Sequence, residues 1–233
     1  HYTSKLQVFS DLDQIESFGF RGEALAALAN VARLCLTTKT LQDEIGARLE
    51  FDTSGEILEQ SKFPREVGTT IMVSDVFRNL PVRQEEFTKN IKREYGKLLP
   101  IVQAYALICG GVKISLFNTT PAGKRQMIFS SSGSLNLKEN AVLAFGAKDA
   151  KGLEVVKGSF EQLQVELDGM VTALNSGMGR RGKDRHFCFV NRRPVELPQV
   201  AKIVTECFRF APGNHNKFPT IILNFTMHWQ GNN

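Results

Sequence analysis

Hydrophobic residues recur at three- and four-residue spacing in four stretches of the chain, which is the spacing of one face of an α-helix. In the first stretch the apolar positions run from Leu25 to Leu34 and predict a helix from about residue 23 to residue 34. The longest stretch runs from about residue 84 to residue 109, and Pro100 is expected to kink or interrupt it. Two further helices are predicted over residues 137–145 and 198–210. The residues expected to face inward on the last helix are Val200, Ile203, Val204 and Cys207.

Between these helices, apolar and polar residues alternate or form short apolar runs bounded by turn residues, which is typical of β-strands. The first half of the chain is expected to contain strands over residues 34–39, 47–52, 56–60 and 70–74, with Ser54 and Gly55 as a hairpin turn. The second half is expected to contain strands over residues 112–117, 126–129, 153–156, 164–173, 186–191 and 220–225. This mixture predicts an α+β chain of two units, residues 1–110 and 111–233.

The composition is that of a chain with two ordinary cores and no membrane span. Of the 233 residues, 42% are hydrophobic, which is enough to fill two domains. No run of about eighteen apolar residues is present, so no contact with a membrane is expected. The four cysteines are widely separated in apolar stretches and are expected to be buried thiols in a reducing compartment. No cluster of Cys and His has the spacing of a metal site, and no metal ligand is assigned.

A pair of glycines, Gly19 and Gly22, directly precedes the first predicted helix. The first turn of a helix carries unpaired backbone N–H groups and the positive end of the helix dipole, which together attract anions. Glycine lets the backbone approach such an anion because it has no Cβ atom. On these residues alone, a tight turn that enters a packed helix explains the glycines better than a phosphate site does.

Positive charge is concentrated in two segments, although the net charge of +5 is mild. In the long helix, the basic residues between Lys89 and Lys97 are diluted by glutamates and are expected to form a solvated outer face. The second segment is a glycine-rich loop together with the strand after it. Its cations are Arg180, Arg181, Lys183, Arg185, Arg192 and Arg193.

The loop cations exceed what the single nearby carboxylate, Asp184, can pair. Contact with nucleic acid is therefore favoured over a solvated loop. Phosphate binding by lysine and arginine is independent of base sequence and weakens as salt rises. The expected partner is double-stranded DNA, bound without sequence specificity.

The string Gly19-Phe20-Arg21-Gly22-Glu23-Ala24-Leu25 resembles motif III of the GHKL ATPases, in the form typical of the MutL mismatch repair proteins. Three other segments agree with that family in order along the chain. They are His1-Tyr2-Thr3-Ser4-Lys5, Gly68-Thr69-Thr70-Ile71-Met72-Val73 and Phe189-Val190-Asn191-Arg192-Arg193-Pro194. The segments Leu80-Pro81-Val82-Arg83 and Asn90-Ile91-Lys92-Arg93-Glu94-Tyr95 most resemble the PMS-type eukaryotic subunit.

This resemblance implies a partial Bergerat (GHKL) ATPase α/β sandwich followed by a ribosomal S5 domain 2-like domain. It also implies that ATP is bound together with magnesium. The residues it assigns to ATP are Gly19, Phe20, Arg21, Gly22, Glu23 and Ala24 around the phosphates, Thr3, Ser4 and Lys5 in the mobile lid, and Thr69 and Thr70 near the adenine. Arg21 contacts phosphate or pairs with Glu23, and both alternatives stay open. Glu23 itself is expected to stabilise the helix N-terminus rather than to act in catalysis.

The family's motifs I and II are not found in the chain, so its catalytic glutamate and magnesium ligands are expected upstream of residue 1. No catalytic residue is assigned, and the chain is not expected to hydrolyse ATP alone. The segment Thr226–Asn233 also departs from the family, which carries a phosphate-contacting lysine there.

The resemblance further implies three properties of the complete protein. These are an Mlh-type MutL subunit as heterodimer partner, a MutS-type mismatch recognition complex as a second partner, and a location in the nucleus. The alternative is a non-enzymatic DNA- or partner-binding module built on the S5-like unit.

Overall fold

The computed structural model describes residues 18–19 and 22–227 and divides into two compact units. Unit 1 runs up to Glu94, and unit 2 begins at Tyr95. The sequence places this boundary at residue 110, whereas the division falls within a helix. The difference arises because the second half of that helix belongs to the core of unit 2, where Ala104 and Leu107 are buried.

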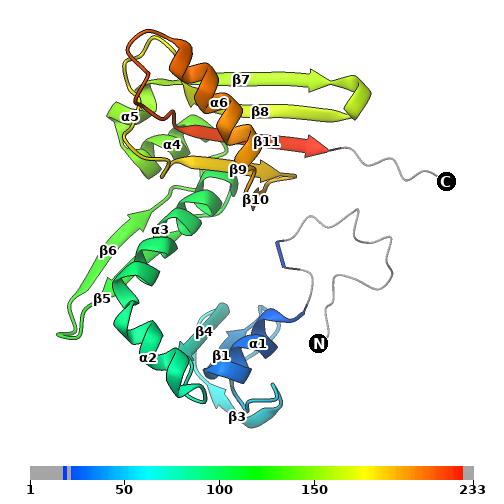
Figure 1. Cartoon of the computed structure of the whole chain (residues 1–233). Helices are drawn as coiled ribbons and strands as arrows, with labels where there is room; N and C mark the ends of the chain where they lie inside the picture. The colour runs from blue at the N-terminus through cyan, green and yellow to red at the C-terminus, as the bar shows by residue number, and fades with distance from the viewer. Residues whose placement is uncertain (1–17, 20–21, 228–233) are drawn as a thin grey trace. The chain divides into compact units, whose positions relative to one another are not determined.

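Unit 1 is built on a four-stranded antiparallel sheet with the strand order β3-β2-β1-β4 (Figure 1). Its strands are β1 (Arg33–Lys39), β2 (Gly46–Phe51), β3 (Ile57–Phe63) and β4 (Gly68–Ser74). The hairpin expected at Ser54 and Gly55 joins β2 to β3. There the Asp52 carboxylate accepts hydrogen bonds from the N–H groups of Ser54 and Glu56 at 2.8 and 2.9 Å. Gly55 has a φ of 90°, a conformation that favours glycine.

Helix α1 (Ala24–Val31) leads into this sheet and is shorter than the sequence predicts. Ala32 is already extended, with φ −146° and ψ 171°. Strand β1 begins at Arg33, which pairs with Ser74 of β4. Leu34 is therefore a strand residue, only 3% exposed, because pairing with β4 replaces the last expected helical turn.

The helix predicted over residues 84–109 is in fact two helices, α2 (Pro81–Lys89) and α3 (Ile91–Ile108). The chain leaves helical geometry at Asn90, which has φ −102° and ψ 14°. The Asn90 side-chain amide donates to the Glu86 carbonyl oxygen at 3.0 Å. Such a local bond competes with continuation of the helix. Pro100 was expected to cause the break, but it lies inside α3 without ending it.

Strand β4 forms one edge of the sheet in the part of unit 1 that the structure describes. Its side chains Ile71 and Met72 are 46% and 58% exposed, and Leu58 on β3 is 70% exposed. Large apolar side chains are usually covered in a folded domain. Unit 1 therefore leaves apolar side chains of β3 and β4 uncovered in the part that the structure describes.

Unit 2 contains a five-stranded sheet with the strand order β10-β9-β11-β8-β7 and a separate two-stranded hairpin (Figure 1). The sheet strands are β7 (Leu153–Phe160), β8 (Val165–Thr172), β9 (His186–Val190), β10 (Arg193–Val195) and β11 (Ile221–Met227). The separate hairpin consists of β5 (Ser115–Thr119) and β6 (Arg125–Ser130). The helices after α3 are α4 (Leu137–Phe145), α5 (Ala147–Lys151) and α6 (Pro198–Phe210). β9 and β11 are parallel and are connected through α6, whereas the other pairs are antiparallel.

Helix α4 begins and ends where its local sequence predicts. The Asn136 side chain accepts a hydrogen bond from the Lys138 N–H at 2.9 Å and caps the N-terminus. Gly146 ends the helix with a φ of 88°, and its N–H donates to the Val142 carbonyl oxygen.

The sheet of unit 2 is covered on both faces, because successive side chains of a strand point to opposite sides. On one face Met170, Phe187, Phe189 and Ile222 pack with Leu107 of α3 and with Ala141 and Phe145 of α4. On the other face Cys188, Ile221 and Leu223 pack with Val200 and Val204 of α6. Figure 1 shows α6 on the opposite side of the sheet from α4 and α5.

The predicted inward face of helix α6 is confirmed for Val200 and Val204, which pack on the sheet, and is wrong for Ile203 and Cys207. Ile203 is 60% exposed and Cys207 is also exposed. The buried residues are instead Thr205 and Phe208, at 6% and 1% exposure. Residues three and four apart share a helix face, so burial of Phe208 places Ile203 and Cys207 on the solvent side. The expectation that all four cysteines are buried is confirmed for Cys188 and wrong for Cys207, whereas Cys35 and Cys109 are only partly buried.

Candidate functional site

The glycine turn lies directly before α1, as the sequence predicts. Gly22 has a φ of 67°, and α1 begins at Ala24. Glu23 is the N-cap residue, is exposed and makes no side-chain capping bond. The first-turn N–H groups of α1 therefore follow a glycine of positive φ, an arrangement that suits an anion. Of the residues assigned to ATP, Thr3, Ser4, Lys5, Phe20 and Arg21 lie outside the described residues.

The two threonines assigned to the adenine lie side by side in sequence on β4. The Thr69 Oγ1 lies 2.9 Å from the Thr38 Oγ1, so this hydroxyl is already paired across the sheet. Thr70 is the next residue of the strand, and neighbouring strand residues point to opposite faces. The two hydroxyl groups therefore face opposite sides of the sheet, and their joint contact with one adenine stays a prediction.

Two of the six loop cations are held by carboxylates. The Arg185 Nη1 lies 2.5 Å from Asp149 Oδ2, and the Arg180 Nη1 lies 3.4 Å from the same oxygen. Arg180 also donates to both oxygens of Asp184, at 2.6 and 3.2 Å. The Arg185 guanidinium lies 4.6 Å from the centre of the Phe145 ring, and its side chain is only 16% exposed. Arg185 is thus enclosed by the fold and is poorly placed to reach a phosphate.

The carboxylate of Asp184 shows how strongly Arg180 is engaged. Its hydrogen bonds from Arg180 are the largest cause that lowers the pKa of Asp184, against the opposing effect of burial. The same bonds raise the pKa of Arg180 above its usual value. Both groups therefore stay ionised at neutral pH, and their ion pair ties residue 180 to residue 184 within the loop.

The pair Arg192 and Arg193 follows β9 in a tight turn. Asn191 and Arg192 have φ values of 47° and 64°. The Arg192 Nη2 donates to the Ile108 carbonyl oxygen at 2.6 Å, where the positive charge satisfies the C-terminal end of α3. Arg193 is partly buried in β10. Arg192 is accounted for by a contact within the fold, and its role toward DNA stays a prediction.

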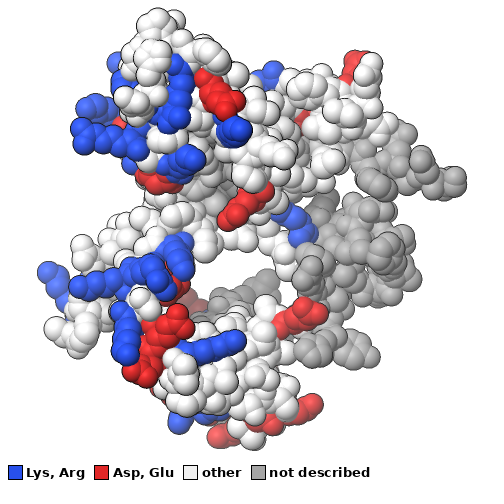
Figure 2. Space-filling model, in the orientation of Figure 1, with Lys and Arg blue, Asp and Glu red and all other residues white. Residues whose placement is uncertain are grey.

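Arg181 and Lys183 are the exposed cations of the predicted set that the loop presents outward. The structure adds two cations that sequence analysis missed, Arg209 at the end of α6 and Lys217 in the loop before β11. The ring of Phe218 lies against both Arg209 and Lys183, and the Lys217 ammonium group donates to the Gly177 carbonyl oxygen of the first loop. Figure 2 shows lysine and arginine side chains gathered over the end of unit 2 where α5 and the loops preceding β9 and β11 lie. The result is a basic surface formed by two loops.

Known proteins that resemble this chain act in DNA mismatch repair. Residues 143–231 match the family described as DNA mismatch repair protein, C-terminal domain. The chain is 38% identical to the mismatch repair endonuclease PMS2 of Gallus gallus over 240 residues, which is 96% of this chain and 27% of the relative. It is 35% identical to the PMS2 protein of Homo sapiens over 247 residues, 97% of this chain and 28% of the relative. The chain belongs to the MutL family and is of the PMS type. The PMS-type chain thus spans about a quarter of the length of these curated relatives.

Solved structures agree with this assignment. A crystal structure of the N-terminal domain of a DNA repair protein matches the PMS-type chain with a TM-score of 0.83 and 35% identity, covering 92% of this chain and 66% of that one. The Aquifex aeolicus MutL ATPase domain complexed with ADP matches with a TM-score of 0.65 and 22% identity, covering 95% and 76%. These matches confirm the expected fold, part of a GHKL ATPase sandwich followed by an S5 domain 2-like domain.

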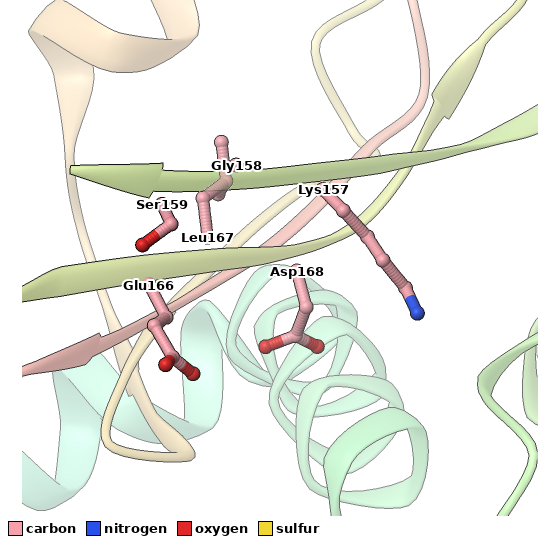
Figure 3. A pocket seen from close by; sticks show the side chains of 6 residues that line it. All are labelled: Lys157, Gly158, Ser159, Glu166, Leu167 and Asp168. Carbon is pink, nitrogen blue, oxygen red and sulfur yellow. The ribbon is translucent and has the colours of Figure 1, made fainter. Parts of the chain in front are cut away.

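A polar pocket of the PMS-type chain opens on the β7–β8 hairpin, away from any residue that the sequence singled out. Figure 3 shows Lys157, Glu166 and Asp168 projecting from the same face of the hairpin. Asp168 accepts a hydrogen bond from the Asn224 side-chain amide at 3.0 Å. The Lys157 ammonium group balances part of the charge of the Glu166 and Asp168 carboxylates, and Asp168 is already paired with Asn224. Because these groups are engaged within the fold, we assign no ligand to this pocket.

Neither a membrane span nor a metal centre is found in the described part of the PMS-type chain. Over residues 18–19 and 22–227, no helix has both the length and the apolar character needed to cross a bilayer. The same residues hold no group of three or more His, Cys, Asp or Glu side chains placed to bind a metal ion.

His186, at the start of β9, makes the stability of unit 2 depend on pH. Burial is the largest cause that lowers its pKa, Lys183 adds to the effect, and a hydrogen bond with Pro219 opposes it. The His186 Nε2 is buried without a hydrogen-bond partner. An unfolded histidine titrates near pH 6.5, so the folded state binds fewer protons than the unfolded state as pH falls below that value. The stabilising contribution is therefore complete above about pH 6.5 and is lost as pH falls through the lower folded pKa.

Urea denaturation at pH 7.5 and pH 5.5 measures this effect. We expect the free energy of unfolding of the wild type to drop at pH 5.5, and His186→Gln to show a smaller drop. The matched control is His215→Gln, which changes an exposed histidine and should keep the wild-type pH dependence. An equal drop in the wild type and in His186→Gln would contradict the assignment.

Proposed function

We propose that this PMS-type chain binds the phosphate backbone of double-stranded DNA through the basic surface of unit 2, without reading the bases. In this proposal it does so as part of a mismatch repair protein that acts in the nucleus. The observation that carries the proposal is the presence of exposed cations from two loops at one end of a sheet, in a chain related to mismatch repair proteins.

The surface is suited to phosphates because its loops are already fixed. Arg180 and Arg185 are tied to Asp149 and to the fold, so they hold the loop rather than contact a ligand. Arg181 and Lys183 are left at the surface. A cation that is positioned before binding loses less side-chain entropy when it pairs with a phosphate. We therefore assign phosphate contact to Arg181 and Lys183 first among the six predicted cations.

Replacement of Arg181 and Lys183 by alanine tests this assignment. Each lysine or arginine that neutralises a phosphate releases counterions, which contributes about −0.9 to the slope of log affinity against log salt. We expect the double variant to bind a mixed-sequence duplex about 10-fold more weakly at 0.1 M salt and to lose about 1.8 from the magnitude of the slope. Fluorescence anisotropy of a labelled duplex over a series of salt concentrations measures both quantities.

The control for this experiment removes the same charge elsewhere on unit 2. Lys138 on α4 and Lys202 on α6 are exposed, and Lys202 lies 3.9 Å from Glu206. The double variant Lys138→Ala with Lys202→Ala should keep the wild-type slope. An unchanged slope in the Arg181 and Lys183 variant would remove this loop from the DNA contact.

The PMS-type chain is also proposed to take part in binding ATP in the complete protein. The supporting observation is the glycine turn, where Gly22 has a positive φ and the side chain of the N-cap residue Glu23 makes no capping bond at the start of α1. The residues Gly19, Gly22, Glu23 and Ala24 suit a phosphate there because their backbone N–H groups precede or begin the helix. Magnesium and hydrolysis are assigned to no residue of the chain.

Binding of a fluorescent ATP analogue tests this second role. We compare the chain as it stands with a version extended at its N-terminus by the segment that precedes the matching region in the Gallus gallus relative. We expect hydrolysis in the extended version, and loss of analogue binding when Gly22 is replaced by valine. The control Gly96→Ala adds a Cβ that meets nothing within 4 Å and should have no effect. Hydrolysis by the chain alone would contradict the account.

An Mlh-type MutL subunit and a MutS-type recognition complex are the proposed protein partners of the complete protein. This proposal rests on similarity to the PMS relatives. Size-exclusion chromatography of the extended version mixed with an Mlh-type subunit tests it, and two separate peaks in the presence of ATP would contradict it.

A further inference from the structure

We infer that the loop 211–218, between α6 and β11, is a second wall of the phosphate-binding surface and that Phe218 is the positioning residue of its cations. This inference rests on the proposed DNA binding by the loop before β9. It adds Arg209 and Lys217 as phosphate contacts, and it assigns to the ring of Phe218 the role of holding Lys183 of the first loop and Arg209 of α6 in one place.

The two loops are fixed to each other through their backbones. Arg180 and Phe218 form an antiparallel bridge in which each N–H donates to the other carbonyl oxygen at 2.8 Å. Asn214 is only 1% exposed, and its side-chain amide donates to the Leu174 carbonyl oxygen at 2.8 Å. The loops therefore form one structural element rather than two independent flaps.

Close approach of the loops depends on Gly179. A Cβ atom at this position would collide with the Cβ of Lys217 and would lie 3.0 Å from the Phe208 ring. The Lys217 ammonium group reaches back across the contact and donates to the Gly177 carbonyl oxygen at 3.1 Å. Lys217 is thus held at the surface of the first loop although it belongs to the second.

The ring of Phe218 gathers cations from two segments, the loop before β9 and the end of α6. The Arg209 Cζ lies 4.2 Å from the ring centre, and the Lys183 Nζ lies 5.5 Å from it. Both distances are within the range of cation–π attraction. The Arg209 Nε also donates to the Lys217 carbonyl oxygen at 3.0 Å, which leaves other N–H groups of the guanidinium for a ligand. An aromatic ring between cations lowers the cost of holding like charges together.

The chemistry of this surface favours a nucleic-acid backbone over an acidic peptide. Peptide and protein partners are usually anchored by apolar side chains that enter pockets. Here the aromatic ring already has cations on it, and the groups offered are ammonium and guanidinium donors. A duplex presents a row of phosphates that can meet cations spread over two loops.

Substitution of Phe218 separates positioning from simple charge. Phe218→Leu keeps the backbone bridge and most of the apolar volume but removes the ring face, whereas Phe218→Tyr keeps the ring. We expect Phe218→Leu to weaken duplex binding about 3- to 10-fold at 0.1 M salt and to lower the salt slope by about 1, because each cation no longer aimed at a phosphate removes about one unit. Phe218→Tyr should bind like the wild type. Thermal denaturation shows whether the leucine variant is folded.

Protection of lysines from acetylation gives an independent readout on the unchanged protein. With a mixed-sequence duplex present, we expect Lys217 and Lys183 to be protected several-fold, while Lys138 and Lys202 react as in the free chain. Poly-glutamate of equal charge should not protect Lys217 at the same concentration. Equal protection by poly-glutamate would identify an acidic polypeptide as the ligand and would overturn the inference.

The outcomes also separate this inference from the proposed function. The inference is wrong, although DNA binding by the loop before β9 stands, if Arg181→Ala with Lys183→Ala flattens the salt slope while Phe218→Leu leaves it unchanged and the duplex does not protect Lys217 from acetylation. If neither set of variants changes the slope, the proposed DNA surface itself is wrong.

Discussion

Replacement of Gly169 by alanine is expected to destabilise unit 2 by about 3 kcal/mol or more. Gly169 lies at the middle of β8, opposite Leu223 of β11 and Val156 of β7. A Cβ atom there would overlap the Ile222 carbonyl oxygen and would lie 2.9 Å from the Leu223 Cα. These are backbone atoms of the neighbouring strand and cannot move aside without opening the β8–β11 ladder. Urea denaturation followed by circular dichroism measures the loss.

The hairpin supplies its own control for this substitution. Gly158 lies on β7, and a Cβ atom there would meet only the Phe160 ring, at 3.5 Å, and the Leu167 side chain. That is ordinary van der Waals contact. Gly158→Ala should therefore change the free energy of unfolding by less than about 1 kcal/mol. Similar losses for the two alanine variants would show that the close packing of β8 against β11 is not what requires Gly169.

Charge reversal at Arg181 and Lys183 is expected to produce the largest functional effect. Glutamate at both positions removes two attractive charges and adds two repulsive ones on a surface that meets phosphates. We expect affinity for a mixed-sequence duplex to fall on the order of 100-fold at 0.1 M salt. The loss should shrink as salt rises, because exposed charges are screened over about 10 Å or less under these conditions. Competition binding with a labelled duplex measures the fall.

The matching control has the same net charge as that variant, but its two charge reversals lie on helices α4 and α6 instead of in the loop. Lys138→Glu with Lys202→Glu also alters the net charge by four units. It should reduce affinity only through the weak long-range field, by about 3-fold or less. Equal losses in the two variants would mean that total charge, rather than this surface, determines binding.

Much of the fold could be predicted from local sequence because local features determine it. The predicted turn at Gly55 and the end of the predicted helix 137–145 at Gly146 each use a glycine whose backbone favours that geometry. Apolar and alternating patterns in the second half located β8, β9 and β11 to within two residues, but they predicted only the first half of β7 and missed the three-residue strand β10. These expectations needed no knowledge of distant contacts.

The errors arise where distant residues decide the outcome. The strand predicted from Leu34 is confirmed, but the helix before it ends at Val31 because the chain pairs with β4 from Arg33, and the helix sequence alone contains no sign of that partner. The inward face of α6 is set by how Phe208 packs, and an apolar residue such as Ile203 is equally compatible with either face. Periodicity predicts that the helix exists, but it does not decide which of two neighbouring apolar stripes faces the core.

The basic surface was predicted in position but not in composition. In the sequence, six cations have only one nearby carboxylate, Asp184, to pair with. In the fold, Asp149, more than thirty residues earlier in the chain, pairs with two of these cations. Arg209 and Lys217 were missed because they come from segments that meet the loop only in the folded chain. A charge count in sequence cannot find pairs or neighbours that the fold creates.

The affinity of the unaltered chain for two unrelated duplexes of equal length, measured across a salt series, shows whether the chain binds phosphates without reading bases. We predict equal affinities for the two sequences and parallel straight lines of log affinity against log salt, with a negative slope of several units. Affinities that differ by more than about 10-fold between the duplexes, or a slope near zero, would contradict phosphate binding by this surface.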